Sequence, residues 1–123
     1  MPAGMNREAA SASRKQLGDL QAERQRLEEP LFHAQRLLRG SLIEKCELAG
    51  GKKRSSPAYY LSVPLPGGRH VLEYVARADL ERVRKDNDAY RRYRKAVSRL
   101  RVLSKQIVKE FDALGKCLEV PLR

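Results

Sequence analysis

The pattern of apolar and polar residues changes twice along this chain. Apolar residues recur at heptad spacing over residues 14–39, alternate more closely over 41–76, and return to heptad spacing over 77–115. Heptad spacing aligns side chains along one stripe of an α-helix, whereas strict alternation places them on one face of a β-strand. The pattern therefore predicts a helix, a small sheet and a second helix, in that order.

The first predicted helix contains a proline. Its stripe consists of leucines with two other residues at the intervening heptad positions: Leu17, Leu20, Arg24, Leu27, Leu31, Ala34 and Leu38. Ser13 is a candidate amino-terminal cap, and Gly40 stands where the helix would stop. Pro30 removes one backbone hydrogen bond inside the helix. Because the leucines stay in phase across this proline, we expect a bend there and not a break.

Three segments between the helices have the composition of strands: "SLIEKCEL" (41–48), "AYYLSV" (58–63) and "RHVLEYV" (69–75). The last two are joined by the turn sequence "PLPGG", in which Gly67 and Gly68 can take positive φ. The first two are joined by a longer, flexible basic loop, "AGGKKRSSP". These features predict a three-stranded antiparallel meander.

The second predicted helix begins with an apolar line at Leu80, Val83 and Tyr90. A heptad stripe then follows, made of Tyr93, Val97, Leu100, Ile107, Phe111 and Leu114. Ser104 falls within this stripe and Leu103 beside it. Gly115 is a plausible stop for the helix.

Neither helix can bury its apolar stripe alone. We therefore expect an α+β fold of order α-β-β-β-α, in which two long helices form an antiparallel coiled-coil hairpin flanking the small three-stranded antiparallel sheet. Residues 13–118 would form this single helix–sheet–helix domain, between a disordered tail at 1–12 and a carboxyl-terminal tail at 119–123. Pairing of the stripes between two subunits, as a homodimer, is the alternative.

The charge of the chain favours a polyanionic partner. Its 123 residues include 26 Lys and Arg against 15 Asp and Glu, a net charge of +11. Such an excess is typical of proteins that bind nucleic acid, and we expect DNA more than RNA. No apolar run approaches the ~20 residues that a membrane-spanning helix needs, and the amino-terminal residues lack the apolar core of a secretory signal. We therefore expect a cytoplasmic protein without a membrane partner.

The basic part of the second helix is the strongest candidate site. From residue 91 to 105 the chain has no Asp or Glu, and its cations are Arg91, Arg92, Arg94, Lys95, Arg99, Arg101 and Lys105. Solvated helices usually alternate charges, because like charges four residues apart repel each other. The first helix offers Glu23, Glu28 and Glu29, too few to neutralise this run. The missing counter-charge predicts contact with nucleic-acid phosphates, and a merely solvated face is the alternative.

Further candidates lie around the sheet. Lys52, Lys53 and Arg54 in the basic loop, and Arg69 after the glycine turn, could contact phosphates on one surface. A flexible solvated loop is the alternative for these cations. The adjacent tyrosines of "AYYLSV" point to opposite faces of a strand, so we expect at least one in the core. We assign Tyr60 as the one that is free to stack on a base.

No arrangement of residues predicts catalysis, a cofactor or a metal site. His33 and His70 have no partner at a spacing typical of a catalytic triad or a zinc site. Cys46 and Cys117 are far apart in the sequence and too few for a disulfide framework or a metal centre. We therefore expect a binding protein and not an enzyme.

Four blocks resemble a widespread, uncharacterised bacterial domain family. They are "LRGSLIEKC" (38–46), "PAYYLS" (57–62), "YV" (74–75) and "LERVRKDNDAYRRYRK" (80–95). The family has a short β-unit with a "GPYYYLS"-like strand, followed by a helix with a "V-R…Y-R-R" pattern, and its genes are often found near transposases. The resemblance implies a Cys-rich metal or redox knuckle before the tyrosine strand. Here only Cys46 of that knuckle is present, and the basic segment "ELAGGKKRSS" replaces the rest.

Two functions follow as hypotheses. The first is a small basic protein that binds nucleic acid mainly through its phosphates, as an accessory or regulatory protein of a mobile element. Such contacts position a protein without specifying sequence, so binding would be weakly sequence-specific. The second is a coiled-coil protein–protein adaptor whose basic face meets an acidic partner.

Overall fold

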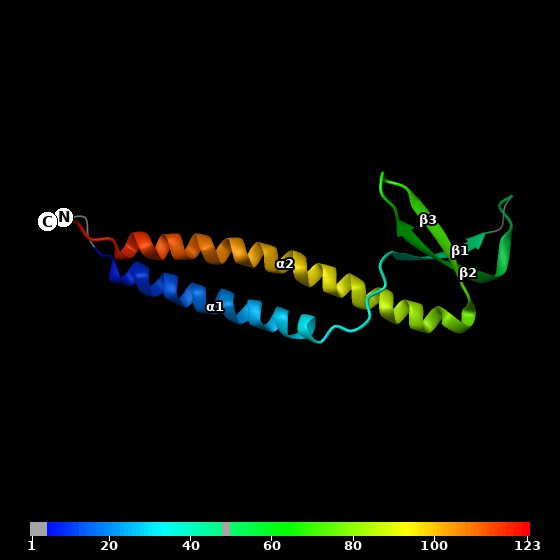
Figure 1. Ribbon diagram of the computed structural model, residues 1–123, viewed down its shortest axis with the longest axis horizontal. Coiled ribbons are helices and arrows are strands. Elements are labelled where there is room, and N and C mark those ends of the chain that lie inside the picture. Colours follow the sequence, from blue (N-terminus) through cyan, green and yellow to red (C-terminus); the bar gives the residue numbers. More distant parts are fainter. Residues whose placement is uncertain (1–4, 48–49) are drawn as a thin grey trace. The chain divides into compact units, whose positions relative to one another are not determined.

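The computed structural model describes residues 5–47 and 50–123 and has an α+β fold (Figure 1). The elements in order are α1 (Arg7–Phe32), β1 (Ser41–Glu47), β2 (Lys53–Pro64), β3 (His70–Val75), a short 3-10 turn η1 (Arg77–Asp79) and α2 (Leu80–Leu118). The predicted class, with two helices and a three-stranded antiparallel sheet, is therefore confirmed.

Contacts within the chain form two compact units. One contains Met1–His33 and Lys95–Arg123, and we call it the helix-pair unit. The other contains Ala34–Arg94, and we call it the sheet unit. That residues 13–118 form a single domain stays a prediction.

The start of α1 differs from the prediction. The helix begins at Arg7, where the side-chain oxygen of Asn6 accepts a hydrogen bond of 3.0 Å from the Ala9 N–H. Ser13 is therefore not the cap but lies buried on the packed face of the helix. Residues 7–12, expected in the disordered tail, form the first turns of α1.

The end of α1 also differs. The helix stops at Phe32, two residues after Pro30, and residues 34–39 have no regular secondary structure. The expected bend with continuation to residue 39 is therefore wrong. Pro30 cannot donate a backbone hydrogen bond, and beyond it Leu38 finds partners in the sheet unit instead, since its N–H donates to the Asp86 carbonyl at 3.0 Å.

The sheet has the predicted meander topology, with strand order β1-β2-β3 and antiparallel pairing throughout. Gly67 and Gly68 take φ of 82° and 77° in the turn between β2 and β3, as their sequence suggested. β2 begins earlier than expected, at Lys53, so much of the predicted basic loop is strand. Residues 48 and 49 of the loop region lie outside the described residues.

The core of the sheet unit lies between one face of the sheet and the first turns of α2. Leu61 of β2, Val75 of β3 and Val83 of α2 are buried together. Tyr59 and Leu38 pack against this cluster. We call this side of the sheet its inner face.

A buried side chain of α2 holds the segment that leads into β1. Asn87 is only 2% exposed, and its amide nitrogen donates to the carbonyls of Leu38 at 3.0 Å and Gly40 at 2.7 Å. Gly40 has φ of 121° and lies so close to β2 that a Cβ would come within 2.7 Å of the Ser62 carbonyl oxygen. Gly40 therefore permits a close approach between the two strands. The prediction that it ends the first helix is wrong, because α1 ends at Phe32.

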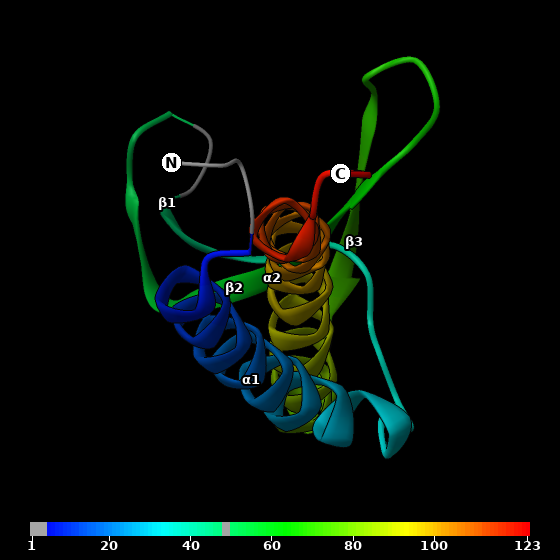
Figure 2. The ribbon, with the colours of Figure 1, turned by 90° about the vertical axis from the view of Figure 1, so that its left-hand side faces the viewer.

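In the helix-pair unit, α1 lies beside the carboxyl-terminal part of α2 and runs antiparallel to it (Figures 1 and 2). The Asn6 N–H donates to the Cys117 carbonyl at 2.8 Å. The buried core is formed by Leu17 and Leu20 of α1 with Leu103 and Ile107 of α2.

The packing face of α2 is rotated from the predicted stripe. Leu103 is fully buried, whereas Ser104 is exposed and Phe111 is 49% exposed. Ile107 occupies the core as expected. The helix continues through Gly115 and ends at Leu118, so the predicted stop is wrong.

Candidate nucleic-acid interface

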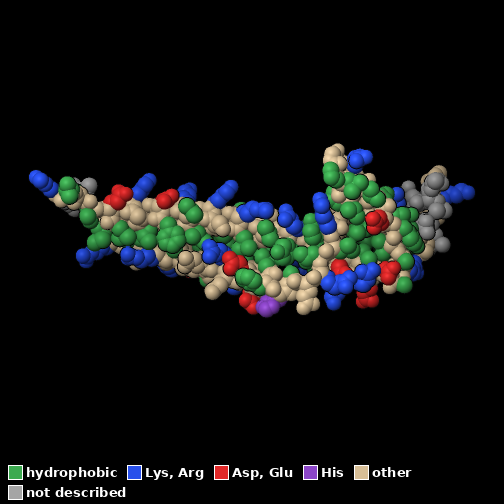
Figure 3. Space-filling model, viewed as in Figure 1, with side chains coloured by type: hydrophobic (Ala, Val, Ile, Leu, Met, Phe, Trp, Pro, Cys, Tyr) green, Lys and Arg blue, Asp and Glu red, His purple; other side chains and the backbone are tan. Residues whose placement is uncertain are grey.

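The cations of α2 point into solvent. Every member of the predicted run is exposed: Arg91, Arg92, Arg94, Lys95, Arg99, Arg101 and Lys105. Figure 3 shows Lys and Arg side chains following one another along the edge of α2. An α-helix advances by about 100° per residue, which puts five of these cations, Arg91, Arg94, Lys95, Arg101 and Lys105, within an arc of roughly 120°. They form a continuous basic strip along one helix.

Arg99 differs from the others because it has a partner. Its guanidinium donates two hydrogen bonds to the Glu23 carboxylate, at 2.9 and 3.1 Å. The hydrogen bond from Arg99 lowers the pKa of Glu23, and the charges of Arg99 and Arg26 act in the same direction. Arg99 is thus engaged within the helix-pair unit and is a weaker candidate for phosphate contact.

The remaining six cations of the run make no ion pair with a side chain in the part of the chain that the structure describes. Elsewhere in the sheet unit cations do find carboxylates: Asp86 lies 3.1 Å from Arg36 and 3.9 Å from Arg82. Other described cations of the sheet unit, such as Lys45, Arg84 and Lys85, likewise make no ion pair. The run is therefore set apart by the absence of Asp and Glu between residues 91 and 105.

The other predicted cations do not form one surface. Lys52 and Lys53 are exposed next to the start of β2. Arg69 is exposed in the turn after the end of the same strand, where its carbonyl accepts a hydrogen bond of 2.7 Å from the Leu65 N–H. The side chain of Arg54 lies outside the described residues. The expectation that Arg69 joins the basic loop is therefore wrong, because the two lie at opposite ends of β2.

The two adjacent tyrosines divide between the faces of the sheet as expected. Tyr59 packs against the buried cluster, and the Arg84 guanidinium lies 5.7 Å from its ring centroid. Tyr60 lies on the other side, which we call the outer face. It is half-buried there and pairs across the strands with Tyr74.

Sequence reasoning missed two residues of the outer face, Tyr74 and Lys45. The ring of Tyr74 lies edge-on to Tyr60, with centroids 5.7 Å apart and planes at 68°. The Lys45 ammonium lies 5.2 Å from the Tyr60 ring centroid. Alternation along β3 could have indicated Tyr74, but its register against Tyr60 was needed to bring the rings together.

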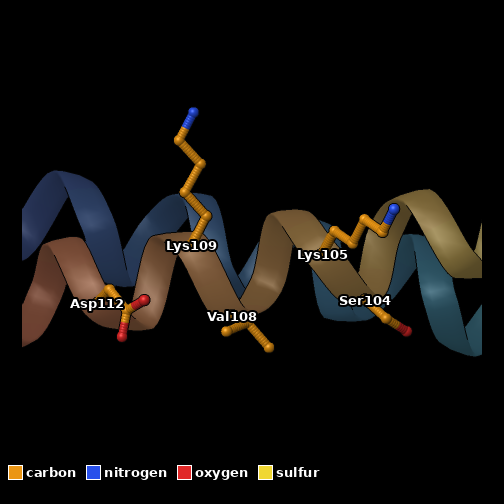
Figure 4. Close-up of a pocket in the computed structure, with 5 residues that line it drawn as sticks. All are labelled: Ser104, Lys105, Val108, Lys109 and Asp112. Carbon is orange, nitrogen blue, oxygen red and sulfur yellow. The ribbon is translucent and has the colours of Figure 1, made fainter.

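A shallow, open pocket lies on the surface of α2 in the helix-pair unit. Its volume is about 430 Å³, and it is lined by Ser104, Lys105, Val108, Lys109 and Asp112. Lys109 extends away from the side on which Val108 and Asp112 lie (Figure 4). Val108 is 61% exposed, so the pocket combines apolar surface with charged side chains.

The groups that most often carry chemistry are dispersed over the described residues. Cys46 and Cys117 are free thiols. The His33 ring lies 2.9 Å from Glu29, and the His70 ring lies 3.4 Å from the Ser62 hydroxyl. Within the described ranges no three His, Cys, Asp or Glu side chains gather as a metal site. No helix there has an apolar stretch that could cross a bilayer.

Comparison with known proteins does not assign a function to these residues. No protein-family model, curated protein or solved structure matches the chain. The resemblance to the bacterial domain family therefore stays an expectation, and the functional argument rests on the residues themselves.

Proposed function

We propose that this protein binds nucleic acid, mainly through phosphate contacts from the basic strip of α2. The observation that carries the proposal is the set of exposed cations between Arg91 and Lys105 that have no carboxylate partner among the described side chains. Like charges four residues apart on a helix, such as Arg91 and Lys95, destabilise it. A phosphate backbone would remove this repulsion by supplying the counter-charge.

The distribution of charge supports the same proposal. Residues 91–105 contain seven Lys and Arg and no Asp or Glu, whereas α1 has five residues of each charge. The excess is therefore concentrated and not spread evenly over the chain. Phosphate contacts are not sequence-specific, so we propose a weakly specific protein with DNA as its preferred polymer. The family resemblance suggests a mobile element as its context.

The test is binding to labelled duplex DNA, single-stranded DNA and RNA across a salt series. For duplex DNA the logarithm of the binding constant should fall with the logarithm of salt concentration, with a slope of about −0.9 per neutralised phosphate. Replacing Arg91, Arg94 and Lys95 together with alanine should therefore reduce the magnitude of the slope by about 2 to 3.

A matched control is available on α1. Replacing the exposed residues Arg14, Lys15 and Arg26 with alanine removes the same charge from a helix that has as many acids as bases. Its slope should stay close to that of the unchanged protein. Equal losses for the two triple variants would show that net charge alone drives binding, and no binding by the unchanged protein at ~50 mM salt would refute the proposal.

The exposed apolar surface of the helix-pair unit favours a second candidate, the protein–protein adaptor. Val108 and Phe111 are 61% and 49% exposed beside the packed seam. In this proposal the helix pair is a coiled-coil hairpin whose free side receives another helix, in a second copy or an acidic partner. Replacing Val108 and Phe111 with serine should then abolish association while leaving the basic strip intact, and sedimentation measures this for self-association.

A further inference from the structure

The outer face of the sheet combines apolar, aromatic and basic side chains, and several of them are exposed to solvent. Alternation from the observed register places on it Ser41, Ile43, Lys45, Ala58, Tyr60, Ser62, His70, Leu72 and Tyr74. Tyr74 is 66% exposed and Leu72 47% exposed. Antiparallel sheets that face water on one side usually place polar side chains there. Exposed aromatic and aliphatic residues gathered on one face indicate a binding surface.

The two aromatic rings on this face differ in how closely their neighbours surround them. Tyr60 lies directly opposite Tyr74 and contacts it edge to face, with 5.7 Å between centroids. Lys45, two positions along the neighbouring strand, places its ammonium 5.2 Å from the Tyr60 ring centroid. Tyr60 is thus fixed by its neighbours, whereas most of Tyr74 stays open to solvent.

Charge is segregated between the two faces of the sheet. Glu44 is opposite Tyr59, and Glu73 is opposite Leu61, so both carboxylates belong to the inner face. Among the side chains that the structure describes, those of the outer face include Lys45 and His70 but no carboxylate. An anionic ligand could therefore lie across the outer face without meeting acidic groups.

We propose that the outer face binds single-stranded nucleic acid, with an unpaired base stacked on Tyr74 and a neighbouring phosphate near Lys45. The proposal rests on the proposed function and adds to it the form of the polymer. Base–aromatic stacking is tolerant of sequence, because every base has a π-face. It requires an unpaired base, since a duplex keeps its bases stacked on each other. A cation beside an aromatic platform is the combination that single-strand-binding surfaces use.

The experiment compares the affinities of single-stranded and duplex probes for Tyr74 variants. The probes are a labelled oligothymidylate of about 15 nucleotides, its RNA equivalent oligouridylate, and a duplex of the same length. Tyr74→Ala should weaken single-strand binding by roughly 5- to 150-fold, the range expected for losing one base–aromatic stack. Duplex affinity should not change. Tyr74→Phe keeps the ring and should retain single-strand affinity.

Two further variants control for structure. Tyr74→Leu keeps an apolar side chain over the sheet but has no ring, so it should lose single-strand affinity as Tyr74→Ala does. Phe111→Ala removes an aromatic ring that is 49% exposed from the helix-pair unit and should have no effect on single-strand affinity. The chain has no Trp, so quenching of tyrosine emission by the bound oligonucleotide provides a second readout.

Each contrary outcome has a separate meaning. Unchanged single-strand affinity in Tyr74→Ala or Tyr74→Leu, while charge removal on α2 still weakens binding, overturns the outer-face proposal and leaves the proposed function standing. No binding of any polymer by the unchanged protein overturns the proposed function, and the outer-face proposal with it. If Tyr74→Ala changed the sedimentation mass of the protein but not its single-strand affinity, the outer-face proposal would be overturned. The occupant of the face would then be a second copy of this chain.

Discussion

Replacing Asn87 with alanine should destabilise the sheet unit by about 2–3 kcal/mol. The amide of this residue, 2% exposed, donates to the carbonyls of Leu38 and Gly40. Alanine leaves both carbonyls without their donor, and each unsatisfied buried group costs about 1–3 kcal/mol. Leu38 and Gly40 are themselves only half-buried, so water can reach part of the space and the lower half of that range applies. The better helix propensity of alanine returns about 0.5 kcal/mol.

The assay is urea unfolding followed by circular dichroism, with the free energy of unfolding extrapolated to water. Asp88→Ala is the matched control, because Asp88 is the next residue on the same helix but is exposed. Its effect should stay within about 0.5 kcal/mol. If Asn87→Ala also stayed within about 0.5 kcal/mol, the two hydrogen bonds would not stabilise the sheet unit and this reasoning would be refuted.

Two more predictions concern stability. Gly40→Ala should destabilise the protein by more than about 1 kcal/mol, because the new Cβ would meet the Ser62 carbonyl oxygen at a position of positive φ. Gly18→Ala should stabilise the protein, because Gly18 lies in the interior of α1 with nothing within 4 Å of a new Cβ. Equal effects of the two substitutions in thermal unfolding would contradict the close approach at Gly40. The hydrogen bond from Arg99 lowers the pKa of Glu23 below its ordinary value of 4.5, so the ion pair stabilises the folded chain above the unfolded pKa and loses this effect as pH falls through the folded pKa. The stability difference between the unchanged protein and Glu23→Gln should therefore be constant near neutral pH and shrink in acid, and a difference that grows in acid would be the opposite of this expectation.

The sheet was predictable because its signals are local. Gly67 and Gly68 mark the turn between β2 and β3, and alternation marks the strands that flank it. The start of β2 at Lys53 was not predictable in the same way. Backbone pairing between Glu47 and Lys53 extends the strand into a segment whose composition is that of a loop.

The helices show where periodicity is ambiguous. A stripe through Leu100 and Ile107 continues equally well with Ser104 or with Leu103 between them, and only packing against α1 selects Leu103. Leu38 is in phase with the leucines of α1 but belongs to the core of the sheet unit. A leucine at the right spacing therefore does not show which core it joins.

Some features of the candidate site follow from the sequence, and others depend on the tertiary structure. The absence of acids between residues 91 and 105 is a property of the sequence, and helical geometry alone puts most of those cations on one strip. That Arg99 is paired with Glu23 depends on two residues far apart in the chain. The contact between Tyr60 and Tyr74 depends on strand register, which composition does not specify.

The sequence by itself determined the element types, the meander and the basic strip, because propensity, turn chemistry and charge act over a few neighbouring residues. Only the tertiary structure decided where α1 ends, which face of α2 is buried and which aromatic rings share a face. Those outcomes depend on contacts between distant residues, such as Asn87 with Gly40. Their free energies exceed the weak local preferences that favour other arrangements.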